Sequence, residues 1–516
     1  MTSLVQSVDW WAIAPPGIIA VLALAVLVTD LFLPETRKEP LGWISTAGLV
    51  LAGLSLLPLT DGDRATFCVN GDGGACSYSA DHFALVIQLL VIGGALLTAL
   101  LSMSAVKELR LPAGEFWFLL LASAAGAALL PASRDLATLV VALEVASLPA
   151  FALVGIKHGD RRSSEAALKF FLSSVTATAV TLMGVSFVYV TTGTLHLTEI
   201  AGRLDHVDGQ FQTLAQAGVA LTLVGFAFKT AAVPFHFWVP DTYVGAPLPI
   251  AAYLSVIGKA VGFSGLILVT AVAFPSYGDV WGPALAVLAA LTMTGGNVAA
   301  LRQSATRASS AVRLLAWSSV GQAGYLLVPI ASAAHTDTPE RAVGSTVAYA
   351  LMYAAVNLGA FAVVVLVARS KPLNRVADYR GLYAERPVTA VLLAFFLLCL
   401  AGLPPGIIGL FAKVTVFSAA VDGGLGWLAV IMAVNVVIAL VYYLRWTAAL
   451  FRAPAHAPAR ATDAPRGEEP ATAAPDGVRV AVPVPLTAAL ALTAVLALAL
   501  SGAPQLVLRF TGPGLF

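Results

Sequence analysis

The most constraining feature of the sequence is a pair of lysines in apolar surroundings with a proline between them. Lys229 and Lys259 are both flanked by apolar residues, and Pro234 follows the first lysine closely. A lysine at bilayer depth costs from about 2.5 kcal/mol upward, so its default interpretation is functional. Proline breaks a helix, and a break at this depth persists only where protein or a wet cavity satisfies the freed carbonyls. The stretch therefore predicts two membrane helices, each carrying an amine, on either side of a break.

The rest of the chain predicts the membrane scaffold that this stretch requires. Of its 516 residues, 59% are hydrophobic and 11% are charged, whereas soluble domains are about a quarter charged. Many apolar runs approach the ~20 residues that cross hydrocarbon, so we expect an all-α polytopic membrane protein with about fourteen transmembrane helices. The expected spans are 12–33, 42–59, 83–104, 115–131, 135–156, 165–191, 212–233, 247–273, 280–300, 306–330, 343–368, 388–420, 424–450 and 482–510. The net charge of +1 indicates no nucleic-acid partner.

A second interruption, Gly402-Leu-Pro404-Pro405-Gly406, lies inside the twelfth expected span. Lys229 precedes the break at Pro234, whereas Lys413 follows the break at Pro404-Pro405. Paired interrupted helices of this kind indicate an inverted-repeat transporter core. We therefore expect two inverted five-helix repeats, each with one broken helix. The expected divisions are three N-terminal helices in 1–110, the first repeat in 111–275, the second in 276–452, a disordered cytoplasmic linker in 453–480 and a C-terminal helix in 481–516.

The distribution of basic residues predicts the orientation. With the amino terminus outside, most of the 29 Lys and Arg residues fall in the loops assigned to the cytoplasm. The outer loops then hold only Arg64, Arg134, Arg203, Arg341 and Arg509. Because cytoplasmic loops carry the excess of Lys and Arg, both termini are predicted to lie on the outer face.

This orientation places Cys68 and Cys76 together in one outer loop, 61–81. Disulfides persist in oxidising compartments, so we predict that the two cysteines pair. The alternative is two reduced surface thiols, and a mass shift on reduction and alkylation distinguishes the two states. Cys399 lies in an apolar run and is interpreted as a core residue. No cysteine spacing resembles a zinc or iron–sulfur site.

A few ionisable groups cannot be assigned to loops. They are Glu144, Lys169, Lys229, Lys259, Lys413 and, just past the first break, His236. A buried lysine beside a buried glutamate keeps its proton and releases it when the partner charge is removed, so a line of such groups connected by water can relay protons. The amines would repel a metal cation and one glutamate supplies too few ligands, so no metal site is expected.

Each of these residues has a plainer interpretation. Glu144 can be a structural carboxylate bonded to a hydroxyl, and His236 can simply cap the freed backbone of the broken helix. Lys169 lies four residues after Glu165, which is typical of an ion pair on a helix surface. Lys229, Lys259 and Lys413 can be members of structural pairs.

The motifs that hold these residues closely resemble the antiporter-like subunits of proton-pumping NADH:quinone oxidoreductase, respiratory complex I. The matching segments carry Leu143-Glu144-Val-Ala-Ser-Leu-Pro, Glu165-Ala-Ala-Leu-Lys169, Lys229-Thr-Ala-Ala-Val-Pro-Phe-His-Phe-Trp-Val-Pro-Asp241, Gly258-Lys259 and Gly402-Leu-Pro-Pro-Gly-Ile-Ile-Gly-Leu-Phe-Ala-Lys413. The likeness runs from the fourth expected span to the thirteenth. Lys rather than Glu at position 413, about fourteen spans without a long lateral helix, and the opening of the sixth span resemble subunit N in particular.

The resemblance implies roles for these residues. In that family the glutamate of the fifth span, here Glu144, pairs with the lysine of the seventh, here Lys229. Lys259 would be the central relay and Lys413 the connection to the far side, and Lys169 matches the sixth-span lysine of the family. One position departs from the pattern: relatives often carry His where Gln322 stands, so a relay here must use water or Tyr325 instead.

The resemblance predicts a proton-translocating subunit of the enzyme that does no redox chemistry itself. No nucleotide fingerprint is present and no strands are expected, so NADH, flavin, iron–sulfur clusters and quinone would be bound by other subunits. Expected partners are the lipid bilayer and subunits like K and M, with the lateral helix of subunit L as a further candidate. The expected location is a bacterial cell membrane. Alternatives are a subunit of a cation/proton antiporter or membrane-bound hydrogenase, or a structural subunit that does not pump.

Overall fold

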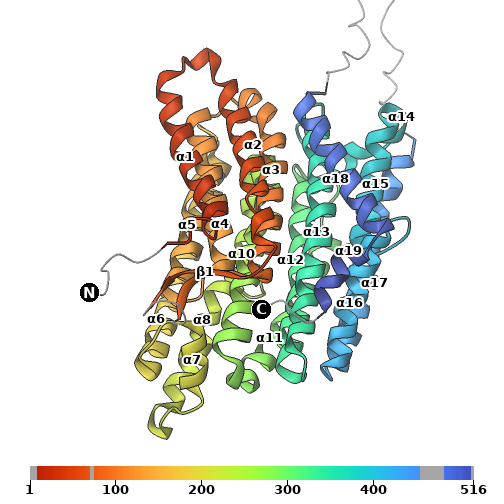
Figure 1. Cartoon of the computed structure of the whole chain (residues 1–516). Coiled ribbons are helices and arrows are strands. Elements are labelled where there is room, and N and C mark those ends of the chain that lie inside the picture. The colour runs from red at the N-terminus through yellow and green to blue at the C-terminus, as the bar shows by residue number, and fades with distance from the viewer. Residues whose placement is uncertain (1–7, 70–74, 454–481, 513–516) are drawn as a thin grey trace, which may run out of the picture.

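The protein is a bundle of long helices with one small hairpin (Figure 1). The computed structural model describes residues 8–69, 75–453 and 482–512. The α-helices are α1 (Ala14–Phe32), α2 (Glu39–Leu54), α3 (His82–Glu108), α4 (Ala113–Leu129), α5 (Leu136–Gly155), α6 (Arg161–Thr192), α7 (Leu197–Leu204), α8 (Gln212–Thr230), α9 (Trp238–Gly245), α10 (Leu248–Ile267), α11 (Gly278–Leu301), α12 (Ser310–Ser332), α13 (Pro339–Ala368), α14 (Leu382–Glu385), α15 (Pro387–Ala401), α16 (Ile407–Asp422), α17 (Gly426–Phe451), α18 (Val484–Gly502) and α19 (Gln505–Leu508).

Shorter elements connect these helices. The 3-10 turns are Glu35–Arg37, Leu57–Leu59, Leu130–Ala132, Gly209–Phe211, Pro275–Tyr277, Ala333–His335, Val376–Tyr379 and Arg509–Thr511, and a π-helical segment, Leu268–Ala273, continues α10. The two strands are β1 (Arg64–Cys68) and β2 (Cys76–Ala80).

Thirteen helices in the described part of the chain are long and apolar enough to cross a membrane. The predicted span 388–420 is instead two half-length helices, α15 and α16, which are separated at the Pro404-Pro405 interruption. The broken span and the thirteen continuous ones together make fourteen in the described part of the chain, which agrees with the predicted number. The prediction of an all-helical, multi-pass membrane protein is therefore confirmed.

The most buried helices lie in the middle of the bundle. The apolar windows of α12 and α13 are 94% buried and those of α3 and α10 are 83% buried. In Figure 1, α12 and α13 lie between α1 and α2 on one side and α15, α16 and α17 on the other. The last long helix, α18, packs against both α13 and α3. It thereby ties the C-terminal end of the chain to its N-terminal helices.

The two predicted interruptions are present as gaps between helices. One separates α8 from α9, and the other separates α15 from α16. The inverted relation of two five-helix repeats, and the division of the chain at residues 110, 275 and 452, stay predictions. Apart from residue 453, the predicted linker 453–480 lies outside the described residues.

The expectation that the chain contains no strands is wrong, because β1 and β2 form an antiparallel pair in the connection between α2 and α3. The hairpin is attached to the bundle by buried contacts. The side chain of Gln88 in α3 donates to the Tyr78 hydroxyl at 3.1 Å, and the Arg134 amide donates to the Ser77 carbonyl at 2.8 Å. The strands are only five residues long and draw on these distant partners, so their local sequence gave little signal.

Cys68 and Cys76 face each other in the register of this hairpin and are joined by a disulfide. The third cysteine, Cys399, is buried and free in α15. Its place in the core agrees with the interpretation drawn from its apolar neighbours.

The second break depends on glycine because α16 begins in contact with the backbone of α15. A Cβ atom at Gly409 would lie 1.7 Å from the carbonyl oxygen of Cys399, and one at Gly406 would lie 2.1 Å from its sulfur. A side chain at either position would therefore push the two half-helices apart. Their close approach sets the position of Lys413, which lies one turn beyond Gly409.

We expect Gly409→Ala to destabilise the protein by about 1–3 kcal/mol, the usual cost of overpacking a filled core. The measurement is the thermal unfolding midpoint of the purified protein. Gly93→Ala in α3 is the matched control, because a Cβ there meets no atom within 4 Å and alanine favours a helix. Equal midpoints for the two variants would contradict the proposed backbone clash.

Candidate functional site

The first break ends α8 with its backbone groups paired. Ala231 adopts a left-handed conformation, with φ of 66°, and its amide donates to the carbonyl of Phe228. The indole of Trp238 donates to that same carbonyl at 3.2 Å, and the Val233 amide donates to the Thr292 hydroxyl at 2.8 Å. These partners come from α9 and α11, so the break is stabilised by protein groups, as its depth in the bundle requires.

Lys229 lies in the last turn of α8 and is only 5% exposed. Its Nζ donates to the Ser174 hydroxyl of α6 at 2.7 Å. The rings of Phe151, Phe170 and Phe228 surround it, with centroids 5.0, 5.4 and 5.5 Å from Nζ. A neutral hydroxyl and three aromatic faces therefore hold this amine.

Glu144 is half-buried on α5, and its carboxylate accepts a hydrogen bond from Thr178 at 2.6 Å. It forms no ion pair with Lys229 within the described residues, although the two charges interact at longer range. Ser174 and Thr178 are one helical turn apart on α6. The same face of α6 therefore presents one hydroxyl to the amine and one to the carboxylate, and the two charged groups make no ion pair within the described residues.

Lys259 is the most buried of the predicted amines, at 2% exposed, and lies in the centre of α10. Within the described part of the chain its Nζ has no hydrogen-bond partner. A buried polar atom without a partner is rare and calls for a functional explanation. An orphaned amine inside a membrane helix is a functional candidate for the same reason.

Lys413 uses the second break directly. Its Nζ donates to the carbonyl oxygens of Leu400 and Ala401, at 3.0 and 2.6 Å. These are the last carbonyls of α15, which the break leaves without helical partners. The amine also lies at the negative end of the α15 dipole, a position that favours a cation. The ring of Tyr325 is 5.9 Å away.

A buried polar network extends from this carbonyl pair toward α12. The side-chain amide of Gln322 donates to the Leu400 carbonyl at 3.4 Å and to the Tyr443 hydroxyl at 3.3 Å. Its oxygen accepts from the Tyr349 hydroxyl, and Tyr443 bonds Ser318. Gln322 therefore joins α12, α13, α15 and α17 through one amide group.

The network continues from α12 to the neighbourhood of Lys259. The Tyr353 hydroxyl donates to the Ser255 carbonyl at 3.2 Å and lies 3.0 Å from the Ser319 hydroxyl, from which it can accept. Asn357 donates to the Ser255 hydroxyl at 2.6 Å. Ser255 lies one turn before Lys259 on α10. Polar side chains thus line the region between Lys259 and Lys413.

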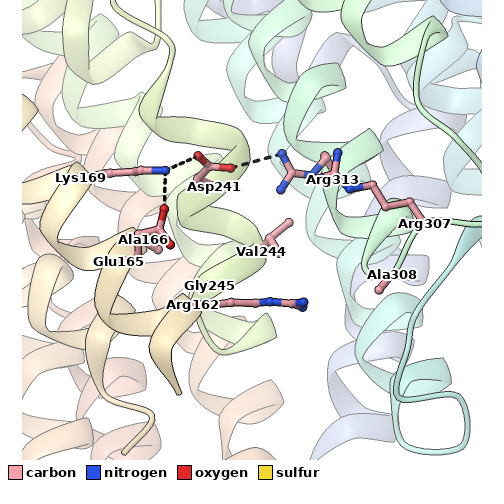
Figure 2. A pocket seen from close by; sticks show the side chains of 10 residues that line it. All are labelled: Arg162, Glu165, Ala166, Lys169, Asp241, Val244, Gly245, Arg307, Ala308 and Arg313. Atoms are coloured by element: carbon pink, nitrogen blue, oxygen red, sulfur yellow. Dashed lines mark hydrogen bonds and ion pairs between the residues drawn. The ribbon is translucent and has the colours of Figure 1, made fainter. Parts of the chain in front are cut away.

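Lys169 lies outside this buried line, in an open charged pocket (Figure 2). Its side chain is 48% exposed and forms ion pairs with Glu165 at 2.7 Å and with Asp241 at 3.0 Å. The Glu165 pair is the i,i+4 contact that its spacing indicated. His236 is also apart from the lysines: it is half-buried and packs beside Trp317, with ring centroids 5.5 Å apart.

Residues 133–439 match the family model described as NADH:quinone oxidoreductase/Mrp antiporter, TM. The chain is 74% identical over its whole length to NADH-quinone oxidoreductase subunit N 2 of Streptomyces griseus, covering 95% of that protein. It is 44% identical over 87% of its length to the subunit N of Salinispora tropica, of which 86% is covered.

The chain belongs to the subunit N family of NADH-quinone oxidoreductases. Among solved structures it resembles a chain of respiratory complex I from Thermus thermophilus, with a TM-score of 0.74, 30% identity and coverage of 97% of this chain and 100% of that chain. The Mrp complex from a Dietzia species matches with a TM-score of 0.78 and 23% identity, covering 97% and 96%. The second likeness shows a shared fold alone.

Within this subunit N chain, sequence reasoning missed several groups that contact the predicted residues or Gln322. Ser174 and Thr178 bond Lys229 and Glu144, and Tyr349 and Tyr443 bond Gln322. The hydroxyl-rich run of α6 was a usable signal, since Ser and Thr seldom gather on one membrane helix without a polar partner. The tyrosines gave no local signal, because their partners lie on other helices.

We expect Gln322→Met to destabilise this subunit, because the hydroxyls and the carbonyl that now bond the amide would lose their hydrogen-bond partner. Each buried polar group left without a partner costs about 1–3 kcal/mol. The measurement is the thermal unfolding midpoint of the purified protein. Gln216→Met is the control, because Gln216 is exposed on α8. The interpretation of Gln322 as a hydrogen-bond centre fails if both variants unfold at the same temperature.

Proposed function

We propose that Glu144, Lys229, Lys259 and Lys413 form a relay through which this subunit moves protons across the membrane. The chain is a multi-pass subunit of the NADH-quinone oxidoreductase family, and the relay is the means by which it would serve that enzyme. The observation that carries the proposal is the set of partners of the three buried lysines. Hydroxyls, carbonyls and aromatic rings hold Lys229 and Lys413, and Lys259 has no partner in the described part of the chain.

This arrangement suits proton exchange better than structural pairing. A buried ion pair at contact distance fixes the proton on the amine, because losing it would leave an uncompensated carboxylate. Here the Glu144 charge acts on Lys229 from beyond contact distance. A modest movement of either group would therefore change how strongly the amine holds its proton. Buried lysines respond readily to such changes in their surroundings.

The polar side chains between the lysines support a route along the bundle. Thr178 bonds the carboxylate and Ser174 bonds the first amine, and Tyr349 and Tyr353 line one small pocket together with Gln322 and Lys413. Gln322 cannot titrate, so a proton would pass this point along hydroxyls or water. We include Lys169 and His236 as peripheral members, where Lys169 would exchange protons with solvent and His236 would act at the break.

The wider role follows from the family. We propose that NADH, flavin, iron–sulfur clusters and quinone are bound by other subunits, and that this chain responds to their reaction by moving protons. Its neighbours would be subunits like K and M and the lateral helix of subunit L. The bacterial relatives support a location in a bacterial cell membrane, and the charge of the loops supports both termini on the outer face.

Two other functions account for part of the same structure. A subunit of a cation/proton antiporter shares the fold, as the Mrp likeness indicates. The 74% identity over the whole chain favours the oxidoreductase instead. Purifying the native assembly and measuring NADH oxidation distinguishes these two, since an antiporter would not oxidise NADH. A purely structural subunit would leave the amines without a purpose that offsets their burial.

We expect the double variant Lys229→Ala with Lys259→Ala to pump clearly fewer protons per electron, because both relay amines are lost. The measurement is proton uptake against NADH oxidation in vesicles that contain the assembled enzyme, with assembly checked on a native gel. The matched control is Lys107→Ala with Lys371→Ala, which removes two lysines whose side chains reach solvent. Normal pumping per electron by the relay variant would refute the proposal and favour a structural role.

A further inference from the structure

The open charged pocket lies between the first turns of α6 and α12, with α9 beside them (Figure 2). Its volume is about 310 Å³. Both α6 and α12 are candidate membrane spans, so their first turns mark the level of a membrane surface. At Gly245 a Cβ would lie 2.4 Å from that of Ala166, so α9 closes tightly on α6 along one wall. The ionisable groups that line the pocket are Arg162, Glu165, Lys169, Asp241, Arg307 and Arg313.

The two carboxylates of the pocket are already paired. Asp241 accepts from Lys169 at 3.0 Å and from Arg313 at 3.3 Å, and Glu165 accepts from Lys169 at 2.7 Å. These contacts join α6 and α12 through the one carboxylate of α9. No carboxylate is therefore left for the remaining two arginines.

Arg162 and Arg307 have no ion-pair partner among the residues that the structure describes. Figure 2 shows their side chains directed into the space between α6 and the segment before α12. The Nε of Arg313 is buried without a hydrogen-bond partner within the described residues. Guanidinium groups gathered in this way repel one another, and an anion placed among them removes the repulsion. The spare donors are N–H groups of arginine, which match phosphate oxygens in geometry.

We propose that this pocket binds a phosphate group, carried by the headgroup of an anionic phospholipid. The level of the pocket at the ends of membrane spans favours a lipid as the source, and basic pockets between membrane helices bind acidic headgroups. Arg162 and Arg307 would contact the phosphate oxygens, and the Arg313 Nε would supply a third donor. Asp241 would keep Arg313 and Lys169 in place without occupying the site. The inference does not depend on proton transfer.

The test measures the reactivity of individual arginines toward phenylglyoxal in the assembled enzyme by peptide mass spectrometry. The enzyme is reconstituted either in phosphatidylcholine alone or in phosphatidylcholine with phosphatidylglycerol. We expect phosphatidylglycerol to slow the labelling of Arg162 and Arg307 several-fold. Arg302, which is exposed in the same segment but does not line the pocket, is the internal control and should react equally in both membranes.

Equal labelling of Arg162 and Arg307 in the two membranes would overturn the proposal. Slow labelling of both arginines, relative to Arg302, in both membranes would also overturn it. That result would indicate that an acidic segment of another subunit occupies the pocket. A third arm adds inorganic phosphate to the enzyme in detergent. Protection in that arm and not with phosphatidylglycerol would overturn the lipid as the source.

A variant pair gives an independent measurement. Arg162→Gln with Arg307→Gln should retain about one phosphatidylglycerol fewer per enzyme after detergent washing than Arg302→Gln does, since one pocket binds one headgroup. The lipid content is read by native mass spectrometry. Equal lipid content in the two variants would contradict the assignment of the site to these arginines.

Discussion

The structure depends on how the backbone is satisfied where two membrane helices stop inside the bundle. Water cannot pair the freed groups in hydrocarbon, so protein side chains must do so. At the first break, Trp238 and Thr292 perform this task for Phe228 and Val233. At the second, Lys413 occupies the carbonyls that end α15. The second break thus fixes an amine, because its position satisfies the backbone and the helix dipole together.

The same constraint explains why the three buried amines differ. Lys413 is held by carbonyls, Lys229 by a hydroxyl and aromatic rings, and Lys259 by no group in the described part of the chain. Lys259 lies in the uninterrupted middle of α10, away from the unpaired carbonyls of a helix end. The second break therefore supplies carbonyl acceptors to Lys413, whereas Lys229 depends on side chains although it lies beside the first break.

The sequence was informative wherever the signal is local. Hydropathy located the spans, proline located both breaks, and the spacing of Glu165 and Lys169 indicated their pair. It was uninformative where partners meet across the fold. Glu144 and Lys229 each bond a hydroxyl of α6, Thr178 and Ser174, and these partners could not be read from the local sequence of either charged residue. The β1–β2 hairpin was missed because its strands are short and rely on distant contacts.

Gln322 is a neutral group in the polar network beside Lys413, and its hydrogen bonds do not depend on protonation. Its amide donates toward α15 and α17 and accepts from α13, so each of its bonds has a fixed direction. A titrating group at this position would exchange donor and acceptor roles as it gained or lost a proton. The amide cannot, so it keeps the Leu400 carbonyl and the tyrosine hydroxyls in one arrangement whatever the charge of Lys413. In the proposed relay, a proton that moves between Lys259 and Lys413 would therefore pass along hydroxyls or water, while the glutamine keeps its hydrogen bonds unchanged.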